Sequence, residues 1–239
     1  MYIDIHSHIL PAVDDGADNE QVAKAMLQTA FEEGITTIVA TPHFVGGLCK
    51  KKKDEIYSKY EETARWWKAI APYNSLYLGN ELFYGENLID NLDKEYAMTM
   101  NGTNYILVEF PVYADFSYIR RAVQTLMYAG YIPVIAHVER YESLKNKKKV
   151  QELVELGCYI QSNASAVLGR DGFKTKMFLS DLLKSSLLHF IATDAHGETE
   201  RGPKIKDCVS FLQRKFGEEK VRELLINNPE KMLKGEAIE

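Results

Sequence analysis

Short apolar segments alternate with amphipathic segments along the whole chain. The apolar segments are rich in aliphatic and β-branched residues, as in Ile38-Val39-Ala40 and Val134-Ile135-Ala136. Strands that are buried on both faces of a parallel sheet have this composition. The pattern therefore predicts seven strands, at residues 2–6, 35–40, 75–81, 105–109, 133–137, 158–162 and 188–193.

The segments between most of these strands have helical periodicity. Asp18 can cap a first helix, with Gln21 three residues later, and Gly34 would end it. Asp115 can cap another helix that ends at Gly130, and further helices are predicted at residues 51–71, 146–156, 174–185, 204–216 and 218–226. Strands separated by helices predict one α/β domain over residues 1–239, built either as a barrel or as an open doubly wound sheet.

The composition disfavours several classes of protein. The chain has 29 basic and 34 acidic residues, and its net charge of −5 argues against nucleic-acid binding. No apolar run reaches the roughly 18–20 residues that span a bilayer, and the first residues lack the features of a signal peptide. Three cysteines, a small and odd number, argue against a disulfide scaffold. We therefore expect a cytoplasmic protein without membrane insertion, whose oligomeric state stays open.

Side chains that bind metal ions lie at the carboxyl ends of the predicted strands. In a βα-barrel these ends meet at one mouth, where such enzymes place their active sites. Nine ligands exceed the three or four of a mononuclear zinc site and suit two or three ions. The candidate ligands are His6, His8, Asp15, His43, Glu81, Glu109, His137, Asp194 and His196.

The types of these ligands narrow the choice of metal. Imidazole and carboxylate groups without thiolate suit Mn²⁺, Fe²⁺ or Zn²⁺, and the hard carboxylate oxygens favour Mn²⁺. A buried carboxylate at a strand end also needs a cationic partner, which a metal ion would provide. His6 and His8 project to the same side of an extended segment, so both can reach one ion. The sixth histidine, His189, begins a strand and is assigned no role in the site.

The candidate ligands belong to longer motifs that cover nearly the whole chain. They are Asp4-Ile5-His6-Ser7-His8, Val13-Asp14-Asp15-Gly16, Ala40-Thr41-Pro42-His43, Ile135-Ala136-His137-Val138-Glu139-Arg140 and Thr193-Asp194-Ala195-His196. Together with Glu81 and Glu109 they resemble the PHP (polymerase and histidinol phosphatase) superfamily. Within it, the likeness is to the bacterial manganese-dependent tyrosine-protein phosphatases of the CpsB/YwqE type.

The resemblance implies a distorted, TIM-like (β/α)7 barrel of the PHP fold that holds three divalent metal ions. One ion would be bound by His6, His8, Glu81 and Asp194, a second by Glu81, Glu109 and His137, and the third by Asp15, His43 and His196. Arg140 and Arg201 match the two arginines that bind phosphate in such phosphatases. The segment at residues 44–49 departs from the family, because it matches no substrate-contacting pattern.

The activity implied by the resemblance is the hydrolysis of phosphotyrosine by hydroxide, because divalent ions lower the pKa of bound water toward about 7. The implied substrate is the tail of an autophosphorylated bacterial tyrosine kinase that controls capsule and exopolysaccharide synthesis. Two alternatives stay open: a small-molecule phosphatase, such as a histidinol-phosphate phosphatase, and an inactive metal-binding regulatory module. The second is weakened because no ligand position is missing.

Two other patterns in the sequence bear on this function. Cys208 and Arg214 have the Cys-x5-Arg spacing of cysteine-dependent phosphatases, but no glycine lies between them and the segment is helical in pattern. A phosphate-binding loop needs free backbone N–H groups, so we interpret the match as accidental. The lysines at residues 50–53 are expected to form a solvated helix start, and the alternative hypothesis is that they steer an anionic phosphorylated tail toward the site.

Overall fold

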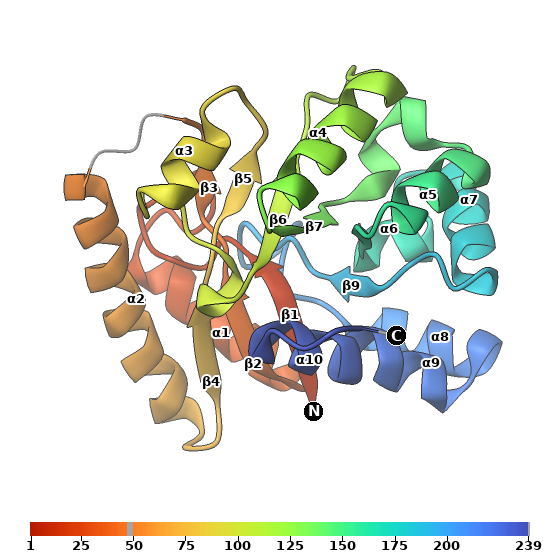
Figure 1. Ribbon diagram of the computed structural model, residues 1–239. Helices are drawn as coiled ribbons and strands as arrows, with labels where there is room; N and C mark the ends of the chain where they lie inside the picture. The colour runs from red at the N-terminus through yellow and green to blue at the C-terminus, as the bar shows by residue number, and fades with distance from the viewer. Residues whose placement is uncertain (47–49, 239) are drawn as a thin grey trace.

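Parallel strands curl around one axis and form the centre of the molecule (Figure 1). A computed structural model describes residues 1–46 and 50–238, with residues 50–52 described by their backbone alone. Within these residues one sheet has the order β1-β2-β4 and the other the order β3-β5-β6-β7-β8-β9. The strands are β1 (Tyr2–Ser7), β2 (Ile35–Ala40), β3 (His43–Phe44), β4 (Ser75–Leu78), β5 (Glu81–Phe83), β6 (Tyr105–Glu109), β7 (Ile132–Ile135), β8 (Tyr159–Asn163) and β9 (Phe190–Ala192).

Two short interruptions divide the barrel wall into these two sheets. Residues 41–42 separate β2 from β3, and residues 79–80 separate β4 from β5, so the strand predicted at 75–81 is broken near its end. Asn80 Nδ2 bridges the two gaps by donating to Pro42 O at 2.8 Å.

The first and last strands meet and complete the barrel. His8 N donates to Ala195 O at 2.8 Å, and Asp194 N donates to His6 O at 2.9 Å. Inside the wall, both carboxylate oxygens of Asp4 accept hydrogen bonds from Thr193, which fastens β1 to the end of β9. If each interrupted pair is counted as one strand, the barrel has seven βα units, and the predicted distorted barrel is confirmed.

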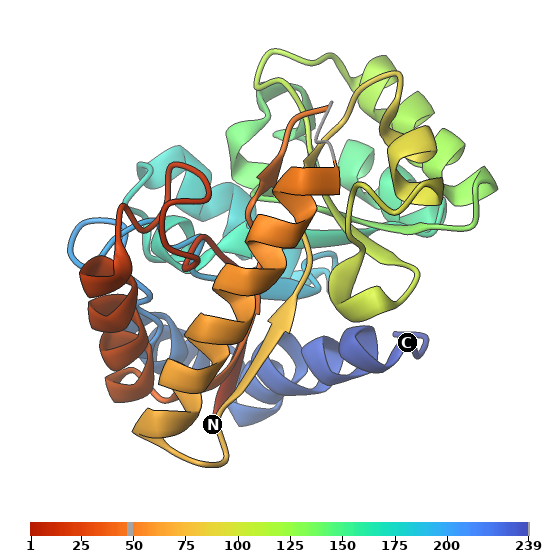
Figure 2. The ribbon, with the colours of Figure 1, turned by 90° about the vertical axis from the view of Figure 1, so that its left-hand side faces the viewer.

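Helices pack around the outside of this wall, and α1 and α2 lie side by side (Figure 2). The predicted capping residue of α1 is wrong: Asn19, not Asp18, accepts from the N–H groups of Gln21 and Val22. Asp115 caps α4 as predicted, by accepting from Tyr118 N at 2.7 Å. The longer helices are α1 (Glu20–Glu32), α2 (Lys50–Ile70), α4 (Phe116–Tyr128), α5 (Lys147–Glu155), α7 (Phe173–Lys184) and α8 (Lys206–Phe216).

Shorter helical segments were only partly predicted. The helix expected at 218–226 divides into α9 (Glu218–Arg222) and a π-helical turn at Glu223–Asn227. The others are α3 (Leu88–Asp93), α6 (Ala164–Leu168) and α10 (Asn228–Lys234), with 3₁₀ turns at Met100–Gly102, Val138–Arg140 and Glu142–Leu144. These segments are three to seven residues long, which is too short for periodicity to identify.

Alternate residues of the longer strands contribute to two separate apolar cores. Ile38, Ile106 and Ile135 pack outward in the core between the wall and its helices. Val39, Leu107 and Val134 point inward, where they join residues of the C-terminal segment such as Met232. The inward-facing side chains fill the barrel at its amino end, and the carboxyl mouth is lined by polar side chains.

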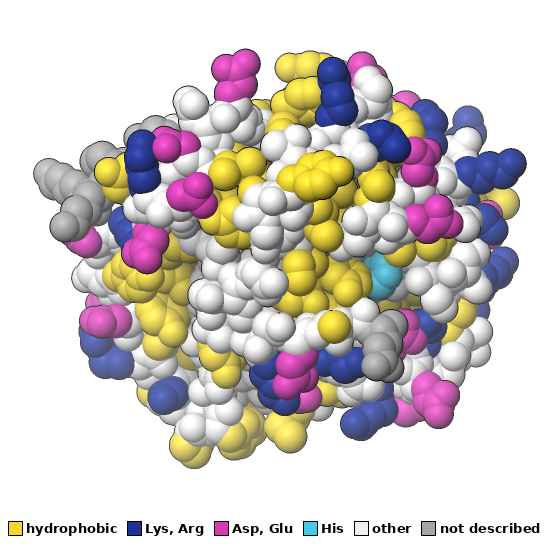
Figure 3. Space-filling model, viewed as in Figure 1, with side chains coloured by type: hydrophobic (Ala, Val, Ile, Leu, Met, Phe, Trp, Pro, Cys, Tyr) yellow, Lys and Arg dark blue, Asp and Glu magenta, His cyan; other side chains and the backbone are white. Residues whose placement is uncertain are grey.

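The outer surface mixes charges of both signs. On the face seen in Figure 1, basic and acidic side chains are interspersed around a central apolar area (Figure 3). A continuous basic area is not visible on this face. Among the described residues, no helix is both long and apolar enough to cross a bilayer.

Candidate metal centre

The structure brings all nine predicted ligands together at the carboxyl mouth of the barrel. Each ligand lies at a strand end or in the segment that follows the strand, and among the described strands β8 is the only position in the wall that provides none. Two ligands come from left-handed backbone, because His137 has φ 33° and Asp194 has φ 51°. Such conformations cost about 1–3 kcal/mol each and cluster at functional sites.

The most deeply buried group consists of His6, His8, Glu81 and Asp194. The Nε2 atoms of His6 and His8 each lie 3.1 Å from Glu81 Oε2. The same two atoms lie 3.4 Å and 3.6 Å from Asp194 Oδ1. The four side chains thus offer ligand atoms that are all within 4.8 Å of one another, which is the size of a site for one ion.

A second group forms around Glu81 and Glu109. His137 Nε2 lies 2.6 Å from Glu81 Oε1 and 3.8 Å from Glu109 Oε2. His43 Nδ1 also approaches this group, at 3.2 Å from Glu81 Oε2 and 3.3 Å from Glu109 Oε1. Glu81 therefore faces two neighbouring groups, as a bridging carboxylate would.

The third group lies nearest to solvent. Asp15 Oδ1 is 3.4 Å from His43 Nε2 and 3.5 Å from His196 Nε2, and His8 completes the group. His8 and His43 thus each belong to two groups, so the side chains are less sharply divided than the resemblance implies. Gly16 allows this loop to fold back, because a Cβ at Gly16 would lie 2.0 Å from His8 O.

Two buried oxygens test whether these residues fit a metal ion. Glu81 Oε2 and Asp194 Oδ1 have no hydrogen-bond partner among the described residues, although both are shielded from solvent. Leaving a buried polar atom unsatisfied costs about 1–3 kcal/mol, and more for a charged group. A divalent cation between the imidazoles and these oxygens would satisfy both, so the donor set fits the group that the sequence predicts.

The pKa values in the site show how strongly its groups depend on one another. Burial alone would lower the pKa of His6, but Glu81 and Asp194 raise it to about 9. Burial would raise the pKa of Asp194, but His6 and Arg140 hold it well below its usual range. The charges of His6 and Asp194 thus stabilise each other, and a metal ion that binds His6 must compete with protons for its ring.

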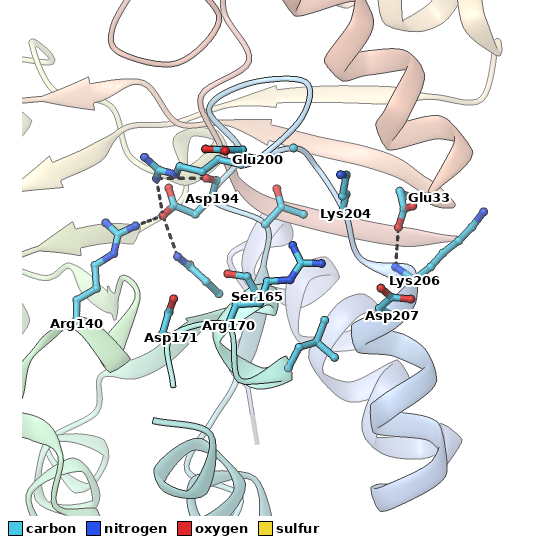
Figure 4. A pocket seen from close by; sticks show the side chains of 15 residues that line it. Glu33, Arg140, Ser165, Arg170, Asp171, Asp194, Glu200, Lys204, Lys206 and Asp207 are labelled. Carbon is cyan, nitrogen blue, oxygen red and sulfur yellow. Dashed lines mark hydrogen bonds and ion pairs between the residues drawn. The ribbon is translucent and has the colours of Figure 1, made fainter. Parts of the chain in front are cut away.

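Two arginines border the cluster on the side of Asp194. Arg140 and Arg201 both donate from Nη2 to Asp194 Oδ2, the latter at 3.1 Å. Their side chains are 38% and 48% exposed, so further guanidinium N–H groups are available to a ligand. With Asp194 they line one end of a cavity of about 480 Å³, which extends past Arg170 and Lys204 (Figure 4).

Several polar residues that hold the ligands in place were missed in the sequence. Asp14 Oδ2 lies 2.7 Å from His8 Nδ1 and also accepts from His43 N at 3.0 Å. Gln161 and Asn163 contact other ligands from the end of β8. The available signals were a second aspartate in the Asp-Asp-Gly motif and two amides at the end of an otherwise apolar strand.

Other singled-out residues lie apart from the cluster. His189 accepts a hydrogen bond from Ile160 N through Nδ1 at 3.1 Å, and burial lowers its pKa to about 4. Cys208 lies inside α8, where burial raises its pKa to about 12, and Arg214 Nε donates to Ser210 O of the same helix. A helix is not a phosphate-binding loop, which supports the accidental interpretation of the Cys-x5-Arg spacing.

The lysine hypothesis and the segment after His43 fall largely outside the described residues. The side chains of Lys50, Lys51 and Lys52 and residues 47–49 belong to that part. Lys53 Nζ donates to Glu95 O at 2.5 Å. Steering by the lysines therefore stays a hypothesis.

A cluster of imidazoles and carboxylates at the mouth of a βα-barrel, bordered by two arginines, defines a barrel metallohydrolase. The chain belongs to the CpsB/CapC family of capsular polysaccharide synthesis, whose model matches residues 2–234. The predicted family resemblance is thereby confirmed.

Relatives of known function align over the full length. Tyrosine-protein phosphatase CpsB of Streptococcus pneumoniae is 32% identical over 242 residues, which cover 99% of this chain and 100% of the relative. Tyrosine-protein phosphatase YwqE of Bacillus subtilis (strain 168) is 35% identical over 243 residues, covering 99% and 93%. A crystal structure from a study of YwqE and CpsB, described as unique metal-dependent tyrosine phosphatases, matches with a TM-score of 0.89 at 32% identity over 99% of this chain and 96% of that chain.

Proposed function

We propose that this protein is a metal-dependent protein-tyrosine phosphatase whose active site is the carboxyl mouth of the barrel. The observation that carries the proposal is the pair of buried, unsatisfied oxygens of Glu81 and Asp194, which face His6 and His8. The names of its relatives CpsB and YwqE support the activity and the class of substrate.

The nine side chains would hold three divalent ions, and their many carboxylate oxygens favour Mn²⁺. Such ions lower the pKa of water and offset charge on phosphoryl oxygens, which this very slow hydrolysis requires. Arg140 and Arg201 bind the remaining phosphoryl oxygens, because a guanidinium group can make paired hydrogen bonds to them. A phenol has a pKa near 10, so the tyrosine leaves without a strong general acid.

The substrate that we propose is a tyrosine-phosphorylated protein, specifically the tail of a bacterial tyrosine kinase in capsule or exopolysaccharide synthesis. The family's description as capsular polysaccharide synthesis supports this context. The cavity beyond the arginines, about 480 Å³, offers room for residues that flank a phosphotyrosine. We place the enzyme in the cytoplasm, where the free thiols of Cys158 and Cys208 are stable.

The decisive experiment couples metal analysis to phosphatase assays. Purified protein is stripped with chelator, reloaded with Mn²⁺, Fe²⁺ or Zn²⁺, and assayed on a phosphotyrosine peptide and on histidinol phosphate. We expect activity to disappear with chelator and return with Mn²⁺, and kcat/KM to be higher for the peptide. Activity that resists chelator would overturn the metal mechanism, and a preference for histidinol phosphate would overturn the protein substrate. An absence of phosphate release from every ester would support the inactive regulatory module.

A further inference from the structure

The end of β8 is polar and fully enclosed, although this strand supplies no candidate ligand. Gln161 and Asn163 are 0% and 6% exposed. Buried amides need a partner for their N–H and C=O groups. Gln161 and Asn163, which we call the amide pair, find these partners in three candidate ligands: His137 and Asp194, which follow the strands on either side of β8, and His6 of β1.

The orientation of the Gln161 amide follows from a backbone contact. One terminal atom of the Gln161 amide lies 2.7 Å from His137 N. Because a backbone N–H can only donate, that atom is the carbonyl oxygen Oε1. The same oxygen lies 3.3 Å from His6 Nδ1. In the neutral ring that a metal requires, Nδ1 therefore carries the hydrogen, and Nε2 keeps its lone pair facing Glu81 and Asp194.

The other half of the Gln161 amide sets the orientation of Asn163. Gln161 Nε2 donates to Asn163 Oδ1 at 3.0 Å, so Asn163 Nδ2 donates to Asp194 Oδ2 at 2.8 Å. That oxygen also accepts from Arg140 and Arg201. Asp194 Oδ1 accepts no hydrogen bond from the described residues and faces the imidazoles.

We infer that the amide pair is a positioning device that sets the His6 tautomer and assigns one oxygen of Asp194 to the arginines and the other to the metal centre. This inference rests on the proposed function, because it concerns the same site. It explains why β8 provides no ligand: its end is occupied by the groups that orient the ligands beside it. Partners of this kind typically change metal affinity or activity about 10–100-fold when removed.

The test compares three variants with a matched control in the full-length protein. Gln161→Met removes both functions of the amide, whereas Gln161→Glu keeps an acceptor for His6 and His137 but, as a carboxylate, cannot donate to Asn163. Asn163→Ala removes the contact with Asp194 and the acceptor of Gln161 Nε2, but it keeps the contacts of Gln161 Oε1 with His6 and His137. Asn228→Ala is the control, because Asn228 is also 6% exposed and donates to His189 O at the other end of the barrel. The readouts are Zn²⁺ affinity by chelator competition, the ¹⁵N spectrum of the His6 ring with Zn²⁺ bound, and KM and kcat with Mn²⁺.

Each variant has its own expected result. In Gln161→Met the His6 ring loses its single tautomer and Zn²⁺ affinity falls about 10–100-fold. In Gln161→Glu and Asn163→Ala the tautomer is kept, and KM for a phosphotyrosine peptide rises because the arginines lose their fixed partner oxygen. The control leaves all three readouts unchanged.

The outcomes also separate this inference from the proposed function. Unchanged KM in both Gln161→Glu and Asn163→Ala would overturn the role of the amide pair while the metallophosphatase proposal stands, as would a preserved tautomer and affinity in Gln161→Met. If Gln161→Met fails to fold, the other two variants decide. Wild-type protein that binds no divalent ion would overturn the proposed function itself.

Discussion

The two ends of the barrel are built from the same strands but in opposite ways. At the carboxyl mouth, imidazoles and carboxylates are packed within a few ångströms of one another, and two of them are held by strained backbone. At the amino end, the C-terminal segment covers the interior with side chains such as Met232 and Ile238. Tyr105 and Tyr159 fasten that segment by donating to Glu236 O and Ile238 O at 2.7 Å and 2.9 Å.

This contrast shows how the chain separates stability from chemistry. Burying charged groups near one another is costly without a compensating cation, so the mouth is a poor source of folding energy. The apolar plug at the other end removes hydrocarbon from water at about 25 cal/mol per Å². Substitutions at the mouth should therefore change turnover, and substitutions at the plug should change stability.

The largest expected effect is that of removing a ligand at the mouth. Asp194→Ala should lower kcat/KM for a phosphotyrosine peptide at least about 1,000-fold. The reason is that bound metal ions stabilise the charge of the transition state by several kcal/mol. Circular dichroism should show an intact fold, since the apolar cores lie elsewhere. His6→Ala should behave alike, and near-full turnover in either variant, with metal content confirmed, would break the comparison.

At the plug, Met232→Ala should have the opposite profile. Met232 is fully buried, so its truncation should lower the free energy of unfolding by about 2–5 kcal/mol while kcat stays within about twofold of wild type. Urea unfolding of the metal-loaded protein measures the first quantity. Tyr128→Ala, at a side chain that is 90% exposed, is the control and should shift stability by no more than about 0.5 kcal/mol.

The arginines at the edge of the mouth should show a smaller loss of activity. Hydrogen bonds to charged groups are worth about 1.5–3 kcal/mol, so Arg140→Ala or Arg201→Ala should reduce kcat/KM about 10–100-fold. Lysine at either position should restore only part of the loss, because it cannot make paired contacts. Arg214→Ala and Cys208→Ala are controls that should keep full activity, and inactivation by Cys208→Ala would instead indicate cysteine chemistry.

The smallest expected effect concerns a histidine at the amino end. His189 has a folded pKa of about 4, below its unfolded value of about 6.5, so the unfolded chain binds more protons between these values. The contribution of His189 to the free energy of unfolding is therefore highest above pH 6.5 and falls as the pH is lowered from 6.5 toward 4. At pH 5 the loss due to this ring is about 2 kcal/mol. Urea unfolding of wild type and His189→Gln at pH 7 and pH 5 should show a flatter pH dependence in the variant. Parallel slopes would contradict the buried, neutral state of this ring.

The positions of the wall segments along the chain and the identity of the candidate ligands were predictable from local pattern. Continuous apolar runs identified the seven wall segments, and a strand end is where a polar residue after such a run must lie. Details that depend on contacts between distant segments were missed. One of them is the break at residues 79–80, where Gly79 packs so closely against Met100 that a Cβ would lie 2.8 Å from Met100 Sδ.

Local competition and tertiary contacts explain the remaining differences. Asp18 and Asn19 are both good capping residues, and in the folded chain it is Asn19 that has the extended backbone and the hydrogen bonds of the cap. The roles of Asp14, Gln161 and Asn163 depend on which side chains of other strands they face. No spacing within the sequence contains that information.

The sequence by itself determined the class of fold, the set of metal-type residues and their common location, because apolar periodicity and strand ends are properties of the chain read in order. Only the tertiary structure decided which of those residues contact one another. It placed Glu81 between two groups, divided Asp194 between arginines and imidazoles, and left two oxygens without hydrogen-bond partners among the described residues. The physical reason is that a hydrogen bond or an ion pair depends on distances of a few ångströms between segments far apart in sequence, and only the closed barrel fixes those distances.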